Sequence, residues 1–199
     1  MKKILHVISS PRGAESFSIQ LGNAIVDKIT AAYPGSIVKE SNLVEKQYPH
    51  LEEAQITSFF TPEQYRTPEN NEAIRHSDES IREIMEADTI VIGAPFYNFS
   101  IHSTLKAWID HIVRVGVTFN MSEKGYEGLV SGKKVYIAIA SGGIYSEGAM
   151  QPYDFAGPYL KAILGFIGIT DVNIFRVEGT AIPGIKDSAL GKAIDSIVL

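Results

Sequence analysis

Short apolar runs of strand length alternate along the chain with stretches of helical period. The run Val135–Ile139 is apolar at successive positions, as in strands that are buried on both faces. The pattern predicts strands at Lys3–Ser9, Ile37–Glu40, Thr89–Gly93, Lys134–Ala140 and Val172–Val177. It predicts helices near Ser16–Tyr33, Asn70–Met85, Ile101–Val115, Phe155–Phe166 and Ile185–Val198. This alternation indicates an α/β fold, a five-stranded parallel sheet with helices on both faces.

One region, Leu43–Thr67, departs from the alternation, and we refer to it as the excursion. It contains several aromatic and proline residues and is too apolar to be a linker. Thr61-Pro62-Glu63-Gln64 has the form of a capping box, so we expect a short helix there. We expect the excursion to wall a binding site or to contact another subunit. No repeat, low-complexity tract or domain boundary interrupts the sequence, so residues 1–199 are expected to form a single domain.

Composition narrows the class of protein. The chain has 199 residues, 45% of them hydrophobic, and a formal net charge of −5, which suits a globular domain and argues against a broad nucleic-acid surface. The absence of cysteine excludes disulfides, thiolate metal sites and a cysteine relay. The apolar run after Lys3 is too short for a signal peptide, and no other stretch is apolar enough to span a bilayer. We therefore expect a cytoplasmic protein without nucleic-acid or membrane partners.

A serine-rich loop follows the first predicted strand. Ser9-Ser10-Pro11-Arg12 leads to Ser16 and Ser18 at the start of a helix. A helix start offers unpaired N–H donors and the positive end of the helix dipole, so it can hold a phosphate dianion. The serines would add hydroxyl donors and Arg12 a charge, although Ser16 on its own would be read as a helix cap. The loop matches neither the Walker A nor the Gly-x-Gly-x-x-Gly pattern, which argues against ATP, GTP or a typical dinucleotide fold.

Two further loops follow predicted strands at the same edge of the sheet. Pro95-Phe96-Tyr97-Asn98-Phe99 comes after the third strand, and Ser141-Gly142-Gly143 comes after the fourth. Open α/β sheets bind ligands at the carboxyl ends of their strands, and a flat aromatic ligand edged with hydrogen-bonding atoms would suit the aromatic loop. Paired glycines let the backbone approach such a ligand closely, whereas on their own they would indicate only a tight turn.

These loops resemble those of a known family. The segments Ser9–Arg12, Pro95–Phe99, Leu105–Asp110, Ser141–Ile144 and Leu164–Ile169 resemble motifs of the FMN-dependent NADH-azoreductases, within the flavodoxin-like NAD(P)H:quinone oxidoreductases. The resemblance covers essentially the whole chain. It implies the flavodoxin-like strand order 2-1-3-4-5, which alternation alone does not distinguish from a Rossmann order. It also implies an FMN-dependent enzyme that takes electrons from NADH or NADPH and reduces quinones and azo compounds by two-electron, ping-pong transfer.

The resemblance also assigns roles to loop residues. The FMN phosphate would be held by Ser10, Ser16, Phe17 and Ser18. The ring would be bracketed by Phe96, Tyr97, Asn98, Phe99, Ala140, Ser141, Gly142 and Gly143. The N–H groups of Gly142 and Gly143 would face N1 and the C2 carbonyl, where the reduced ring carries negative charge. The family often has Arg or Thr at Ala140-Ser141 and His at Tyr145, so the phenol of Tyr145 is an alternative donor.

The expected assembly is a homodimer. A crevice at a sheet edge leaves one side of the ring open to solvent, and this chain offers no second domain to cover it. The excursion and the apolar segment Phe119–Met121 suggest subunit contacts, and the resemblance implies a dimer with the site at its interface. Two alternatives remain: a flavodoxin-type FMN electron carrier without a nicotinamide site, and a nonredox α/β binding protein. The serine loop lacks the Thr/Ser-x-Thr-Gly-x-Thr pattern of the carriers, which argues against the first.

The histidines do not indicate a metal site. His6 lies within the first strand, where a core position is expected, and His50 and His76 are expected at the surface. His102 and His111 are nine residues apart, unlike the i, i+4 spacing of a helical metal pair. We therefore expect no bound metal.

The helix that follows the aromatic loop has explanations of its own. Trp108 falls on a helical stripe and is expected in the core. Lys106, Asp110 and Arg114 are spaced i, i+4 and i+8, which predicts a solvated ion-pair ladder. No Ser-His-Asp or paired-carboxylate arrangement is recognisable, so we expect no catalytic side chain and assign the chemistry to the flavin.

Overall fold

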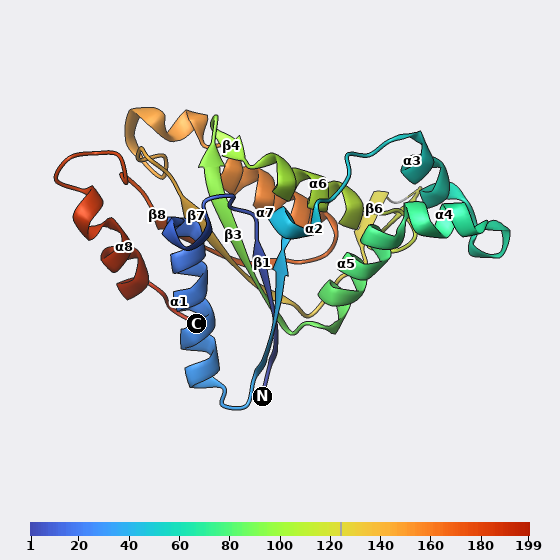
Figure 1. Ribbon diagram of the computed structural model, residues 1–199, viewed down its shortest axis with the longest axis horizontal. Helices are drawn as coiled ribbons and strands as arrows, with labels where there is room; N and C mark the ends of the chain where they lie inside the picture. The colour runs from blue at the N-terminus through green and yellow to red at the C-terminus, as the bar shows by residue number, and fades with distance from the viewer. Residues whose placement is uncertain (124) are drawn as a thin grey trace.

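The five predicted strands form one parallel sheet. The computed structural model describes residues 1–123 and 125–199, and the strands are β1 (Lys3–Ile8), β2 (Ile37–Asn42), β3 (Thr89–Tyr97), β7 (Lys134–Ala140) and β8 (Asp171–Val177). They lie in the order β2-β1-β3-β7-β8, and all neighbours are parallel (Figure 1). The predicted order 2-1-3-4-5 is therefore confirmed. The chain changes direction across the sheet beside β1, where open α/β sheets bind ligands.

Helices cover both faces of the sheet. On one face lie α1 (Phe17–Ala32) and α8 (Lys186–Asp195), and on the other lie α5 (Arg75–Glu86), α6 (Ser103–Ile112) and α7 (Ala156–Phe166) (Figure 1). Ile4 joins the core beneath α1 and α8, whereas its neighbour Leu5 joins the core beneath the other three helices. Successive strand residues point to opposite faces, so a strand between two helical layers is apolar at every position. This explains the unalternated apolar runs.

Strand β3 runs past its predicted end at Gly93. Its pairing with β7 continues as far as Pro95 opposite Ala140, and the strand ends at Tyr97. The chain then turns and pairs back as the short antiparallel strand β4 (Ser100–Ile101). The aromatic loop is thus the tip of a hairpin that stands at the carboxyl edge of the sheet.

The helix predicted at Asn70–Met85 is divided into α4 (Pro68–Ala73) and α5. The two meet at Ile74, whose backbone (φ −98°, ψ 2°) leaves the helical region and whose side chain is fully buried. Apolar periodicity continues across this junction, so the pattern alone did not reveal the break.

The excursion contains three short elements: α2 (Leu43–Lys46), α3 (Glu53–Phe60) and the 3₁₀ turn η2 (Glu63–Tyr65). The capping box predicted at Thr61 is wrong, since its hydroxyl donates to the Thr57 carbonyl (2.8 Å) and η2 begins without a side-chain cap. A reciprocal box forms instead at the start of α4. There the Thr67 hydroxyl accepts from the Asn70 N–H (3.3 Å), and the Thr67 N–H donates to the Asn70 side chain (3.0 Å).

A second, two-stranded sheet was not predicted. It consists of β5 (Phe119–Ser122) and β6 (Gly125–Gly128), which pair as an antiparallel hairpin. The base of this hairpin packs backbone to backbone on the turn after α7: a Cβ at Gly128 would lie 2.1 Å from the Gly168 nitrogen. Across the described ranges, none of the helices combines the length and apolarity needed to cross a membrane.

Candidate functional site

A cleft of about 370 Å³ opens at the carboxyl ends of β1, β3 and β7. It brings together most of the residues predicted from the three loops: Ser10, Ser16, Phe17, Phe96, Tyr97, Ala140, Ser141 and Gly142. Arg12, Pro95, Thr180 and Ala181 also line it. Ser18, Asn98, Phe99 and Gly143 are not among the lining residues, and their positions are described below. Among the described residues that line this cleft, none is His, Asp or Glu.

The serine end of the cleft lies at the N-terminus of α1. Ser16 occupies the N-cap position, but its side chain makes no capping hydrogen bond. Its hydroxyl lies instead 3.0 Å from the hydroxyl of Ser18, which is fully buried directly behind it. The reading of Ser16 as a simple helix cap is therefore wrong. The first N–H groups of α1 have no partner within the helix and remain available to an anion.

Arg12 adds a cation to this end. Its side chain is exposed, it lines the cleft, and no carboxylate in the described part of the chain forms an ion pair with it. The Arg12 N–H approaches the Ser10 hydroxyl at 3.4 Å, which draws the two residues into one turn ahead of the 3₁₀ turn η1 (Gly13–Glu15). Hydroxyls, a helix N-terminus and a free guanidinium together suit a phosphate.

The opposite end of the cleft is the glycine loop that follows β7. The carbonyls of Ser141, Gly142 and Gly143 accept hydrogen bonds from the N–H groups of Thr180 (3.3 Å), Ala181 (3.0 Å) and Gly179 (3.1 Å). In a trans peptide the carbonyl and the following N–H point in opposite directions, and the described chain has no cis peptide.

The N–H groups of Gly142, Gly143 and Ile144 therefore point away from the segment after β8. In the described chain we find no acceptor for any of the three. Unpaired backbone donors are rare where they are shielded from water, so these groups suit an oxygen or nitrogen acceptor on a ligand. Gly142 lines the cleft directly, and Gly143 packs against the ring of Tyr145, whose Cε2 would lie 3.1 Å from a Cβ at Gly143.

The aromatic hairpin tip forms one side wall. Asn98 (φ 48°) and Phe99 (φ 68°) both occupy the left-handed region, as the two central residues of a tight hairpin turn do. The ring of Phe96 packs on Tyr145 at 4.3 Å between centroids. The ring of Phe99 contacts Tyr145 (6.1 Å) and Tyr153 (5.3 Å) instead of the cleft. The hairpin and the glycine loop are thus joined by aromatic contacts.

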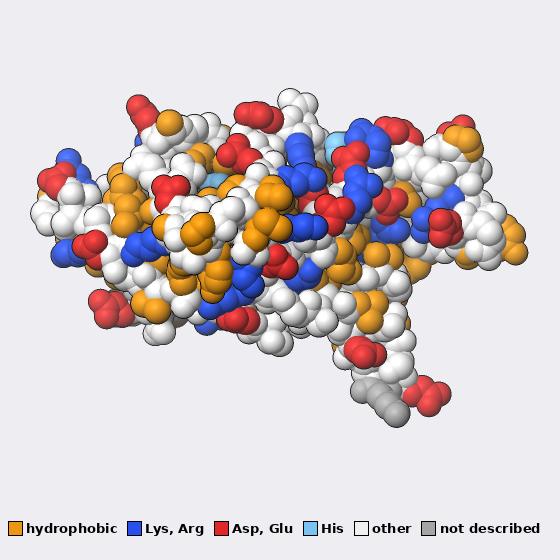
Figure 2. All heavy atoms as spheres, turned by 90° about the horizontal axis from the view of Figure 1, so that it is seen from below, with side chains coloured by type: hydrophobic (Ala, Val, Ile, Leu, Met, Phe, Trp, Pro, Cys, Tyr) orange, Lys and Arg blue, Asp and Glu red, His pale blue; other side chains and the backbone are white. Residues whose placement is uncertain are grey.

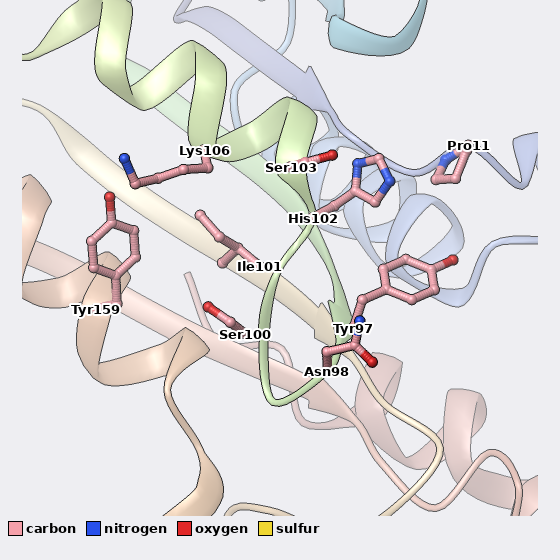
Figure 3. A pocket seen from close by; sticks show the side chains of 9 residues that line it. All are labelled: Pro11, Tyr97, Asn98, Ser100, Ile101, His102, Ser103, Lys106 and Tyr159. Atoms are coloured by element: carbon pink, nitrogen blue, oxygen red, sulfur yellow. The ribbon is translucent and has the colours of Figure 1, made fainter. Parts of the chain in front are cut away.

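A second hollow, of about 720 Å³, opens on the other side of Tyr97. Figure 3 shows Asn98 on its rim, with Lys106 and Tyr159 converging from α6 and α7. Lys106 forms an ion pair with Asp110. Burial, together with that carboxylate, raises the pKa of Tyr159 to about 12, so its phenol is a neutral donor near pH 7. Tyr97 lines both the cleft and this hollow.

The predictions for the histidines hold in part. His6 is buried in the sheet, its Nε2 has no hydrogen-bond partner among the described residues, and a Cβ at Gly22 of α1 would lie 2.7 Å from that atom. Burial lowers the pKa of His6 to about 4. His50 is exposed as predicted, but His76 is only half exposed and packs on Tyr48 at 5.2 Å. Within the described residues no cluster of three metal-ligating side chains exists.

The other predictions for the helix after the hairpin are mixed. Trp108 is 1% exposed, which confirms a core position. The ion-pair ladder is only half correct: Lys106 pairs with Asp110, but Arg114 lies beyond the end of α6 and is buried. Its guanidinium reaches Asp78 of α5 at 2.6 Å. The helix stops at Ile112, so the assumed spacing does not extend to Arg114.

Sequence reasoning missed Thr180 and Ala181. They follow β8 and reach the cleft because β8 is the neighbour of β7 in the sheet. The available signal was Glu178-Gly179-Thr180 directly after the fifth predicted strand, at the same sheet edge as the other loops.

Comparison with known proteins agrees with this architecture. A family model described as flavodoxin-like fold matches residues 2–198. The chain is 47% identical over 199 residues to an FMN-dependent NADH:quinone oxidoreductase of Herminiimonas arsenicoxydans, covering 99% of this chain and 97% of that protein. It is 45% identical to a protein of the same name from Mesorhizobium japonicum, covering 98% and 95%.

Solved structures extend the comparison. The crystal structure of an azoreductase from Bacillus anthracis strain Sterne superposes with a TM-score of 0.91 at 29% identity, covering 98% of this chain and 96% of that one. An FMN-dependent NADH-azoreductase from the Ames Ancestor strain, solved in complex with FMN, gives 0.86 at 26% identity, covering 98% and 97%. With near-complete coverage of relatives at more than 40% identity, the chain belongs to the flavodoxin-like family of FMN-dependent NADH:quinone oxidoreductases.

Proposed function

We propose that this chain is an FMN-dependent NAD(P)H oxidoreductase that reduces quinones and azo compounds, with residues 1–199 acting as one FMN-binding domain. The observation that carries the proposal is the polarity of the cleft. One end offers hydroxyls, helix N–H groups and the Arg12 guanidinium, whereas the other offers three backbone N–H groups, and neither Arg12 nor these N–H groups have a partner among the described residues. A phosphate at one end of a ligand and a carbonyl-edged ring at the other match these two ends.

The residues present fit FMN. Ser10, Ser16 and Arg12, with the N-terminus of α1, would hold the phosphate, and Ser18 would support Ser16 from behind. Phe96 and Tyr97 would flank the ring on the hairpin side. Asn98 and Phe99 would act next to the site, through the hollow beyond Tyr97 and through Tyr145.

The backbone donors of the glycine loop would serve the pyrimidine edge of the ring. Gly142 and Gly143 would donate there, because their N–H groups have no acceptor in the described chain. Fixed donors aimed at a position that gains negative charge stabilise the charged form without reorganising. Ala140 and Ser141 would complete this wall, with Ser141 held in place by a hydrogen bond from its hydroxyl to the Gly143 carbonyl (2.8 Å).

The protein itself would bind, orient and exclude water. Bound FMN would supply the redox chemistry, taking two electrons from the nicotinamide and passing them to the acceptor. The hollow beyond Tyr97 would give the nicotinamide or the acceptor room beside the ring, with Tyr159 and Lys106 as polar contacts.

Steady-state kinetics would test this function. The protein, reconstituted with FMN, should oxidise NADH in the presence of a quinone and give parallel double-reciprocal lines, because donor and acceptor use the same side of the ring in turn. Intersecting lines would contradict the shared position. FMN binding without NADH oxidation would favour the alternative, a flavodoxin-type electron carrier. A colourless protein that does not oxidise NADH would favour a nonredox binding protein.

We also propose that the active unit is a homodimer, which supplies the wall that a single chain lacks. The hairpin β5–β6 projects from the body at the lower right of Figure 2, and Met121 and Tyr126 on it are each 66% exposed. Phe60 and Tyr65 of the excursion are exposed to 71% and 72%. Exposed aromatic and apolar groups of this size are typical of subunit contacts. A cytoplasmic location stays a prediction.

A further inference from the structure

Glu178 contacts the glycine loop from outside the cleft. It follows directly after β8, and its Oε1 accepts hydrogen bonds from the N–H groups of Tyr145 (2.8 Å) and Ser146 (3.0 Å). Its Oε2 accepts from the Ser146 hydroxyl. The carboxylate is only 12% exposed. Three donors from two consecutive residues therefore converge on one shielded carboxylate, a strong and directional arrangement.

Arg176 connects this carboxylate to the helix α7. Its Nη1 lies 3.7 Å from Glu178 Oε1, and its Nη2 lies 2.5 Å from Asp154 Oδ2. The other carboxylate oxygen of Asp154 accepts from the Gly157 N–H (3.0 Å) in the first turn of α7. A Cβ at Gly157 would lie 2.4 Å from Arg176 Nη2, so the guanidinium would have to shift from this position if residue 157 carried a side chain.

The two ends of the glycine loop are thus held by different groups. Carbonyls 141–143 are held by N–H groups 179–181, and N–H groups 145 and 146 are held by Glu178. Between the two anchored stretches lie the N–H groups of Gly142, Gly143 and Ile144, which have no acceptor in the part of the chain that the structure describes. Their direction is therefore determined by both anchors.

We propose that Glu178, supported by Arg176, is a positioning residue that fixes the glycine-loop N–H groups toward the pyrimidine edge of the flavin and so raises the reduction potential of the bound FMN. The inference rests on the proposed function. Donors at this edge stabilise the reduced, negatively charged ring more than the oxidised ring. When the glycine loop is no longer held by Glu178, oxidised and reduced FMN both bind more weakly, and the affinity for reduced FMN falls more.

The sign of the effect separates positioning from direct electrostatics. If Glu178 acted only through its negative charge, removing that charge would stabilise the reduced ring and raise the potential. If it acts by positioning, Glu178→Ala lowers the potential. For a two-electron couple, a tenfold greater loss of affinity for the reduced form corresponds to a fall of about 30 mV.

The experiment compares Glu178→Ala, Glu178→Gln and Ser146→Ala with the wild type. Glu147→Gln serves as the matched control, since it is an exposed carboxylate near the same loop whose side chain makes no capping bond. We expect Glu178→Ala to weaken FMN binding about tenfold and lower the potential by about 30 mV. Glu178→Gln and Ser146→Ala should lower the FMN affinity and the reduction potential by smaller amounts. Glu147→Gln should change neither the affinity nor the potential.

Hydrogen exchange on the FMN-free protein provides a readout that does not depend on the cofactor. The N–H groups of Tyr145 and Ser146 should be protected in the wild type and lose protection in Glu178→Ala. If the wild type binds no FMN, the proposed function fails, while the exchange data still test the anchor. Unchanged potential and unchanged exchange in Glu178→Ala, or a raised potential in Glu178→Gln, would overturn the inference. Ser146→Ala keeps the test valid if the Glu178 variants do not fold.

Discussion

The hydroxyl of Ser16 lies at the N-terminus of α1 without capping it. The adjacent buried hydroxyl of Ser18 is its partner, at 3.0 Å. The side-chain oxygen of an N-cap serine normally accepts a hydrogen bond from the N–H of the second or third helical residue. With the Ser18 hydroxyl donating to it, the Ser16 hydroxyl could donate toward the cleft, which is the basis of its proposed role in phosphate binding.

Replacing both serines by alanine tests this role. Each lost charge-assisted hydrogen bond is worth about 1.5–3 kcal/mol, so Ser16→Ala combined with Ser18→Ala should weaken FMN binding by at least about tenfold. The melting temperature of the FMN-free protein should change little. Quenching of FMN fluorescence gives the affinity, with Ser188→Ala on the outer side of α8 as the control. Unchanged affinity in the double variant would refute the phosphate assignment.

Because His6 is buried, we expect the free energy of unfolding to depend on pH. Burial lowers its pKa from 6.5 to about 4, so between these values the unfolded chain binds a proton that the folded chain does not. The free energy of unfolding should therefore fall as the pH decreases from 6.5 to 4, by up to about 3 kcal/mol from this residue. His111 has a pKa lowered by burial and acts in the same direction.

Urea denaturation at pH 7 and pH 5 measures this dependence. His6→Leu removes the titrating group and should flatten the loss of stability between the two pH values. An equal loss in the variant and in the wild type would contradict the assignment to His6.

At the scale of elements, the attachment of the hairpin β5–β6 depends on two glycines. A Cβ at Gly128 would lie 2.1 Å from the backbone of Gly168, and backbone cannot move aside as a flexible side chain can. We expect Gly128→Ala to reduce the free energy of unfolding by about 1–3 kcal/mol. Gly165→Ala, in α7, where the added carbon would meet no described atom within 4 Å apart from the neighbouring backbone of its own helix, should be neutral or stabilising. Equal stability of the two variants, measured by urea denaturation, would contradict the packing described.

The elements that periodicity predicted well are those buried on the sheet. Strand β7 was predicted with its observed bounds because every position between its ends is enclosed by helices. Strand β3 was predicted to end too early, at Gly93. Its next residues are in the strand because they pair with β7, and this pairing is not visible in the sequence of β3 itself. The hairpin β5–β6 was missed because an exposed two-stranded sheet carries little hydrophobic signal. The break at Ile74 was missed because apolar spacing runs through it.

At the scale of the whole molecule, the strand order explains why the site was largely predictable. Loops after β1, β3 and β7 meet at one edge in any parallel sheet of this order, so Ser16, Phe96 and Gly142 were identified from strand ends and the family resemblance. The contribution of the loop after β8 was missed. Its residues are held beside the cleft by backbone hydrogen bonds to the glycine loop. Backbone hydrogen bonds do not depend on the type of side chain, so the sequence does not indicate them.

The proposed dimer also belongs to this scale. The wild type should elute at twice the chain mass in size-exclusion chromatography with light scattering at assay concentration. Met121→Ser combined with Tyr126→Ser should shift the population toward monomer, because both exposed side chains lie on the hairpin β5–β6 that we propose contacts the partner subunit. Ile37→Ser alters an apolar side chain, 58% exposed, on the edge strand β2 and should leave the mass unchanged. A monomeric wild type with full activity would contradict the dimer and leave FMN binding intact.

We propose that FMN binds in the cleft between the serine loop and the glycine loop. Titration of the purified, folded FMN-free protein with FMN, followed by quenching of flavin fluorescence, tests this binding. We expect saturable binding that reaches one FMN per chain, with the double serine variant requiring at least about tenfold more FMN for half saturation. Absence of saturable binding by a folded wild type, even at a large excess of FMN, would contradict it.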